Sequence, residues 1–172
     1  LRLQSRRVQA EDAREALAEA GRRVASIAAI HEVLAQDPGD HIDFDAVLDR
    51  LLSVERDLAS AYAPGVEIIR QGSLGMVATD AASPLAMAVS ELVHNAVEHA
   101  GAHTICVEPS RSDGRIGVTV RDDGAGMGLT TDEGLGLQIV RTLIEEDLHG
   151  ECEITSPAGG GCVILVSLPW ND

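Results

Sequence analysis

The chain has 172 residues and a formal net charge of −15, with 28 acidic residues against 13 basic ones. All 13 basic residues are Arg, so the sequence contains no Lys. A Walker-type phosphate loop, a protein-kinase fold and Schiff-base catalysis each need a Lys, and these classes are excluded. The acidity also argues against a nucleic-acid partner, because such binding depends on clustered positive charge that neutralises phosphates.

The charge is distributed unevenly along the chain. Residues 1–30 carry six Arg and four acidic residues, for a net charge of +2. Residues 31–172 carry seven Arg and 24 acidic residues, for a net charge of −17. Because like charges repel, we expect the main body to bind a polyanion only with the help of a metal ion.

Length and composition indicate one medium-sized domain, or a small domain with an appendage, and a cytoplasmic location. Apolar residues make up 45% of the chain and aromatic ones 2%, so the core must be aliphatic. No segment approaches the ~20 apolar residues of a membrane span, and the N-terminus does not resemble a signal peptide. Three widely spaced Cys indicate buried small side chains in a reducing compartment rather than a zinc or redox site.

Apolar residues at alternating spacings of four and three predict two N-terminal helices. The first series is Ala13, Leu17, Ala20, Val24, Ile27, His31 and Leu34, and the second is Phe44, Val47, Leu51, Val54, Leu58 and Ala61, after Asp43 as a cap. A helical hairpin that keeps an exposed apolar stripe, which would favour a further helix or another copy of the chain, and one that simply faces the core fit equally well. We expect His31 to be packed in its series, and His41, His103 and His149 to lie on the surface.

Beyond residue 65 the periodicity changes to that of an α/β sandwich. Strand-like runs occupy 66–69, 76–78, 103–108, 115–121, 151–155 and 162–168, and helices are expected over 84–100 and 137–147, the first opened by Ser83 and Pro84. This order predicts an α+β fold, a two-layer α/β sandwich with helices on one face of a mixed sheet, preceded by the helical hairpin. We place the domain boundary between residues 1–62 and 63–172.

Three motifs in the second part carry candidate chemistry. On the helix before Ala100, Glu91 and Asn95 lie one turn apart, opposite an apolar face; a solvated outer face is the plain alternative. Asp122, Gly124 and Gly126 follow a strand with the spacing Asp-x-Gly-x-Gly, where a carboxylate can accept an adenine amino proton and glycines allow close approach. Gly134-Leu135-Gly136-Leu137 then opens a helix, where exposed backbone amides can face an anion.

Each motif alone is weak, but their order resembles the Bergerat-type ATP-binding fold of histidine kinases, type II topoisomerases, Hsp90-like chaperones and mismatch-repair ATPases. Residues 91–100 (ELVHNAVEHA) resemble the Asn-bearing motif, and Gly161-Cys162 through Leu168-Pro169 resemble the closing strand. Residues 22–34 (RRVASIAAIHEVL) and the following helix resemble sensor histidine kinases of the HWE-related class. The resemblance extends over nearly the whole chain.

The resemblance implies a role for each matching residue. Asn95 would hold Mg²⁺ against the ATP triphosphate, helped by His99, and Glu91 would act as the base. Asp122 would recognise adenine in a pocket shaped by Gly124 and Gly126. The remaining nucleotide-binding positions would be Gly134, Leu135, Gly136 and Leu137, with the loop at 127–133 closing over the phosphates as a lid.

The resemblance also implies partners and two departures from the family pattern. The full protein would pass the ATP γ-phosphoryl to a histidine and then to an aspartate of a response regulator, and would form a homodimer through the hairpin. The acceptor histidine would lie upstream of Leu1, so we expect this chain to bind Mg-ATP without phosphorylating itself. Glu98 stands where relatives often have Lys, and Cys162 stands where they have Thr or Ser.

Two other functions remain open at this stage. An anti-sigma-factor serine kinase has a similar Asn motif but no reason to carry a long helical hairpin. A degenerate module that dimerises, with or without bound nucleotide, is favoured by Glu98 and Cys162. Titration with Mg-ATP discriminates the last possibility from the kinases.

Overall fold

A five-stranded mixed sheet forms one layer of the protein, in a computed structural model that describes residues 2–35, 39–126 and 134–170. The side chains of residues 2–16, 19 and 62 lie outside this description. The strand order is β2-β4-β5-β7-β6, in which β2 and β4 are parallel and the other neighbours antiparallel. The bounds are Glu67–Arg70 for β2, Thr104–Ser112 for β4, Arg115–Asp122 for β5, Glu151–Thr155 for β6 and Val163–Pro169 for β7. A separate antiparallel pair joins β1 (His41–Asp43) to β3 (Met76–Ala78).

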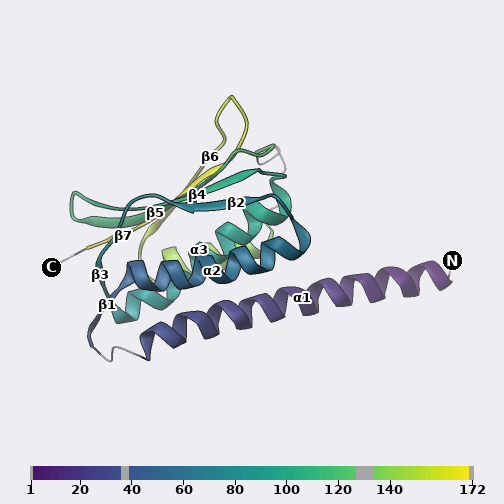
Figure 1. Ribbon diagram of the computed structural model, residues 1–172, viewed down its shortest axis with the longest axis horizontal. Coiled ribbons are helices and arrows are strands. Elements are labelled where there is room, and N and C mark those ends of the chain that lie inside the picture. Colours follow the sequence, from purple (N-terminus) through teal and green to yellow (C-terminus); the bar gives the residue numbers. More distant parts are fainter. Residues whose placement is uncertain (1, 36–38, 127–133, 171–172) are drawn as a thin grey trace.

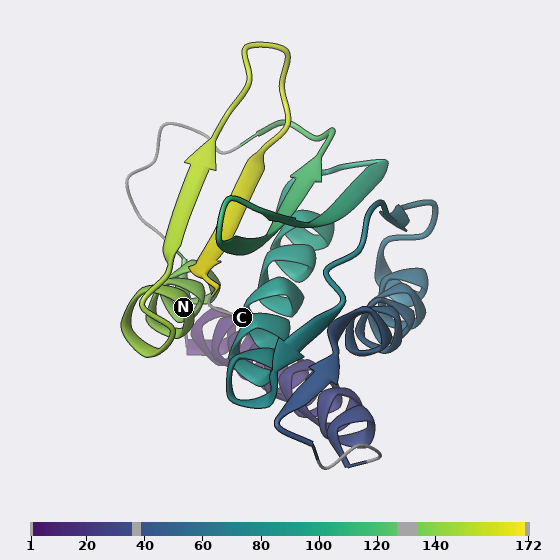
Figure 2. The same ribbon diagram turned by 90° about the vertical axis from the view of Figure 1, so that its left-hand side faces the viewer.

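The helices lie on one face of this sheet (Figure 2). They are α2 (Phe44–Tyr62), α3 (Thr79–His99) and α4 (Leu135–Arg141), which continues into the π-helical segment η1 (Thr142–Asp147). The long helix α1 (Arg2–Leu34) packs on the outer side of α2 and α3, and its N-terminal half projects beyond the rest (Figure 1). The predicted sandwich with helices on one face of a mixed sheet is therefore confirmed. None of the described helices is long and apolar enough to cross a membrane.

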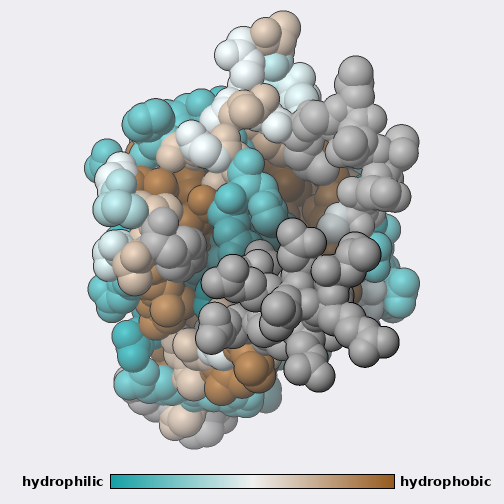
Figure 3. Space-filling model, turned by 90° about the vertical axis from the view of Figure 1, so that its right-hand side faces the viewer, coloured by the Kyte–Doolittle hydropathy of each residue, from teal (hydrophilic) through white to brown (hydrophobic). Residues whose placement is uncertain are grey.

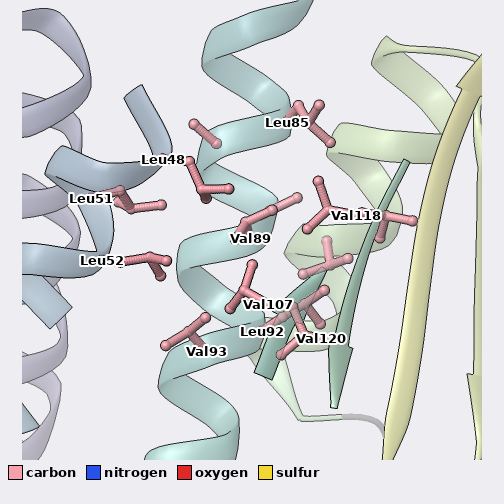
Figure 4. Packing of buried hydrophobic residues seen from close by; sticks show 14 of the residues in the cluster. Leu48, Leu51, Leu52, Leu85, Val89, Leu92, Val93, Val107, Val118 and Val120 are labelled. Atoms are coloured by element: carbon pink, nitrogen blue, oxygen red, sulfur yellow. The ribbon is translucent and has the colours of Figure 1, made fainter. Parts of the chain in front are cut away.

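The core between the helices and the sheet is aliphatic, as the composition predicts. Leucines and valines of α2 and α3 point toward valines of β4 and β5 (Figure 4), including Leu48, Leu51, Leu52, Leu85, Val89, Leu92, Val93, Val107, Val118 and Val120. Each such side chain contributes about 1.5–3 kcal/mol on burial. Because α2 and α3 share one buried cluster, the hairpin and the sandwich are packed together, and the boundary at residues 62 and 63 stays a prediction.

Two elements extend further than their sequence patterns indicate. Helix α3 begins at Thr79 rather than at Pro84, which lies inside the helix and removes one backbone hydrogen bond. Ala82, on the added turn, is fully buried, so packing on the core offsets that loss. Strand β4 runs through Pro109 to Ser112; its neighbour β2 stops pairing at Val107, and no donor is needed on that edge at Pro109.

Helix α1 does not bury the predicted apolar series. Leu17, Val24 and Ile27 are exposed, and the face turned toward the core carries Ser26, Ala29 and Ile30 instead. The expectation of a packed His31 is wrong for the single chain, because His31 lies on the exposed side with that series. His41, His103 and His149 are exposed as expected. Asp43 is the N-cap of α2, and its side chain accepts a hydrogen bond from the backbone of Asp45.

Candidate nucleotide-binding site

Helix α3 presents Glu91 and Asn95 to the start of α4. Both side chains are half-buried, whereas the opposite face of α3 is fully packed on the core. A Cβ atom at Gly136 would lie 2.9 Å from Asn95 Oδ1 and 3.2 Å from Glu91 Oε2. A larger residue at Gly136 would displace these polar groups, so glycine permits this close approach of α4. The Asn motif and the Gly-x-Gly motif, about 40 residues apart in sequence, are thus brought together.

The turn after β5 holds Asp122 beside the end of α3. Asp122 Oδ1 accepts a hydrogen bond from Gly124 N at 2.9 Å, and Ala125 N donates to Ala100 O at 2.8 Å. A Cβ at Gly124 would lie 2.1 Å from Ala100 O, so no other residue fits there without moving the backbone. Gly126 has a positive φ of 77°, as the motif predicts for one of its two glycines. The turn therefore fixes Asp122 relative to the helix that carries Asn95.

Strand β7 begins next to the same turn. Asp122 N donates to Cys162 O at 3.0 Å, and Gly161 N donates to Gly124 O at 2.7 Å. Cys162 is buried, and burial, followed by the charge of Asp122, raises the pKa of its thiol. The sequence departure at Cys162 thus lies directly beside the carboxylate that the resemblance assigns to adenine.

The remaining sequence-predicted positions fall into three groups. Gly134 is the N-cap of α4, and Leu137 is buried beneath that helix, whereas Leu135 is exposed. His99 is also exposed, and its Nε2 lies 3.7 Å from Glu98 Oε2 rather than beside Asn95. The predicted lid over 127–133 lies outside the described residues.

A buried polar cluster joins three helices close to this site. Ser90 Oγ of α3 donates to Glu55 Oε1 of α2 at 2.7 Å and lies 2.9 Å from Ser26 Oγ of α1. Burial raises the pKa of Glu55 above its usual value, although the two serine hydrogen bonds act against it. Sequence reasoning missed Glu55, yet a signal exists: it stands among Leu51, Leu52 and Ala59 on the apolar face of α2.

His94 and Glu98 form a second polar contact on α3. His94 is 8% exposed, and its Nε2 lies 3.1 Å from Glu98 Oε2. Burial and the nearby Arg22 lower the pKa of His94, while Glu98 acts against this shift. The imidazole is therefore neutral at pH 7, and the contact is a hydrogen bond rather than an ion pair.

Comparison with protein families agrees with this geometry. Residues 80–172 match the family described as histidine kinase-, DNA gyrase B-, and HSP90-like ATPase. The chain belongs to this ATPase family. Residues 1–59 match a second family model, described as histidine kinase. The resemblance to sensor histidine kinases of the HWE-related class, read from the motifs, is confirmed.

Individual relatives of this ATPase-family chain are histidine kinases. Sensor histidine kinase PdtaS of Mycolicibacterium smegmatis is 40% identical over 178 residues, covering 98% of this chain and 36% of the relative. The chain therefore spans just over a third of the length of that curated relative. The blue-light activated histidine kinase EL346 of Erythrobacter litoralis is 26% identical with a TM-score of 0.75, covering 87% of this chain and 53% of the other. Its histidine kinase domain gives 24% identity and a TM-score of 0.74, with 87% and 73% covered.

Proposed function

We propose that this chain is the ATP-binding catalytic portion of a two-component sensor histidine kinase. The observation that carries the proposal is the convergence of Asn95, Glu91 and the start of α4 at Gly136. Family membership supports ATP as the nucleotide. The full protein would transfer the γ-phosphoryl of ATP to a histidine and then to an aspartate of a response regulator, in the cytoplasm.

The residues of the site fit Mg-ATP in their chemistry. Mg²⁺ takes oxygen ligands and keeps most of its waters, so the amide oxygen of Asn95 suffices as a protein ligand, and the ion would neutralise triphosphate charge. Asp122 would accept the adenine amino proton, and the backbone amides at Gly134 to Gly136 would face the phosphates. Glu91 would orient the attacking group through its carboxylate.

Binding of Mg-ATP to purified chain tests this proposal by isothermal titration calorimetry. Asn95→Ala should abolish measurable binding, because it removes the amide oxygen that holds Mg²⁺. Gln71→Ala is the matched control: it also deletes a side-chain amide, but from an exposed position away from α3, and it should leave the affinity unchanged. EDTA should abolish binding to the wild-type chain. Wild-type chain that does not bind, or that binds equally well in EDTA, would contradict the proposal.

The proposal assigns no acceptor role to the histidines of this chain. The resemblance places the acceptor on the helix preceding α1, whereas His31 lies in α1 itself. Incubation with γ-labelled ATP should leave the chain unlabelled. Label on His31 would show that the acceptor has been misassigned.

We also propose that the full protein is a homodimer and that α1 contributes to its interface. Leu17, Val24 and Ile27 are 73%, 65% and 37% exposed and recur at helical spacing, so a second copy would bury them. Val24→Glu should dissociate the dimer in light-scattering measurements, because it places a charge in this contact.

A further inference from the structure

Helix α1 reaches the candidate site through two consecutive arginines. Arg23 Nε donates to Glu91 Oε1 at 2.8 Å, and the two side chains are 29% and 12% exposed. The other oxygen of Glu91, Oε2, is the one that faces Gly136. One carboxylate is therefore held by α1 on one side and presented to the start of α4 on the other.

Arg22 adds a second contact to the same helix face. Its Nη2 lies 3.7 Å from Glu98 Oε1, and its side chain is 16% exposed. Among the residues that the structure describes, Arg22 Nε is the one buried side-chain nitrogen or oxygen without a hydrogen-bond partner. Arg22 thus keeps a buried donor available next to Glu98 and His94, which line the same small hollow or contact it.

The buried serine–glutamate cluster sets the position of this contact. Ser26 lies one turn after Arg22 and Arg23, and it joins Glu55 and Ser90 through hydrogen bonds of 3.3 and 2.9 Å. A shift of α1 along α3 would break these buried bonds, at a cost that rises because no water replaces them. The register of α1 against Glu91 is therefore defined.

Charge gives the contact a consequence for nucleotide binding. Glu91 and Glu98 flank Asn95 on α3, in a main body of net charge −17, and both would repel a triphosphate. The positive charges that offset them come from α1, in the segment of net charge +2. The end of the molecule where α1 begins shows a band of hydrophilic side chains between apolar areas (Figure 3). Arg22 and Arg23 supply, from another helix, the positive charge that Glu98 in place of Lys removes from α3.

We propose that Arg23 is a positioning residue for Glu91 and that docking of α1 completes the Mg-ATP site. The inference rests on the proposed function, since the ligand is Mg-ATP. Arg23 keeps Glu91 ionised and turned toward Gly136, and Arg22 offsets Glu98. Because coupling between two binding events is reciprocal, bound Mg-ATP stabilises the docked α1 to the same extent that docking raises the affinity.

Calorimetry on matched variants of the chain tests the coupling. Arg23→Ala should weaken Mg-ATP binding about fivefold to tenfold, the size expected for a partly buried charge contact, and Arg23→Lys should recover most of the affinity. Arg50→Ala is the control: Arg50 pairs with Glu32 of α1 at 2.9 Å, so the same charge is lost from an exposed contact. In a Glu91→Gln background, Arg23→Ala should change the affinity less than twofold, because its partner charge is gone.

Hydrogen–deuterium exchange of α1 supplies a second readout. Mg-ATP should slow exchange over residues 22–34 in the wild-type chain and not in Arg23→Ala. Wild-type and Asn95→Ala binding data separate the two proposals: failure of the wild-type chain to bind overturns both. Normal wild-type binding with Arg23→Ala no weaker than Arg50→Ala, or with an undiminished effect in the Glu91→Gln background, overturns only the role of Arg23.

Discussion

Gly136→Ala should separate nucleotide affinity from folding stability at one position. The added Cβ would stand 2.9 Å from Asn95 Oδ1 and 3.1 Å from Asn95 Nδ2. A relaxed carbon–oxygen contact is about 3.5 Å, so the amide must retreat by roughly 0.5 Å. Mg²⁺ requires its ligands at about 2.0–2.1 Å and tolerates little displacement.

The expected loss of affinity follows from the interaction that is disturbed. A contact to a charged group contributes about 1.5–3 kcal/mol, and each 1.4 kcal/mol is tenfold in Kd, so Mg-ATP binding should weaken about 10- to 100-fold. Stability should move the other way. Replacing a helical glycine by alanine stabilises by about 0.5–1 kcal/mol, and the melting temperature should stay level or rise by about 2 °C.

Gly134→Ala provides the matched control for this pair of measurements. A Cβ at Gly134 would meet no atom within 4 Å, and its φ of −61° is allowed for alanine. Its Kd in calorimetry should stay within about twofold of wild type. The reasoning is refuted if Gly136→Ala binds Mg-ATP like wild type, or if Gly134→Ala loses as much affinity.

Two further predictions concern stability. Gly124→Ala should destabilise the chain by about 3 kcal/mol or more, seen as a large drop in melting temperature, because its Cβ would stand 2.1 Å from the backbone oxygen of Ala100; a loss under about 1 kcal/mol would show that the turn can move. Burial raises the pKa of Glu55 above 4.5, so the folded chain holds this proton more tightly than the unfolded chain. The stability that depends on Glu55 is therefore full below about pH 4.5 and is lost as the pH rises through the raised pKa. Glu55→Gln should lose less melting temperature than wild type between pH 4.5 and pH 8, and parallel profiles would contradict the assignment.

Local patterns in the sequence determined the site's parts and the type of fold. The spacing of Asp122, Gly124 and Gly126 indicated the turn after a strand, and the Gly-x-Gly at Gly134 and Gly136 indicated a helix start. Both are short-range features, set by backbone conformations that neighbouring residues permit. Alternating apolar residues likewise predicted β5 and β7 within about a residue of their bounds.

Tertiary packing decided where those parts meet and which helix faces are buried. The apolar series of α1 predicted a helix correctly but not its buried side, because a surface helix presents the face that its neighbours complement. Here Ser26 meets Glu55 and Ser90, and Arg23 meets Glu91, across 29 to 68 residues of sequence. No periodicity within α1 encodes contacts of that range. The sequence by itself therefore determined the chemistry of the nucleotide site, and only the tertiary structure showed that α1 contributes to it.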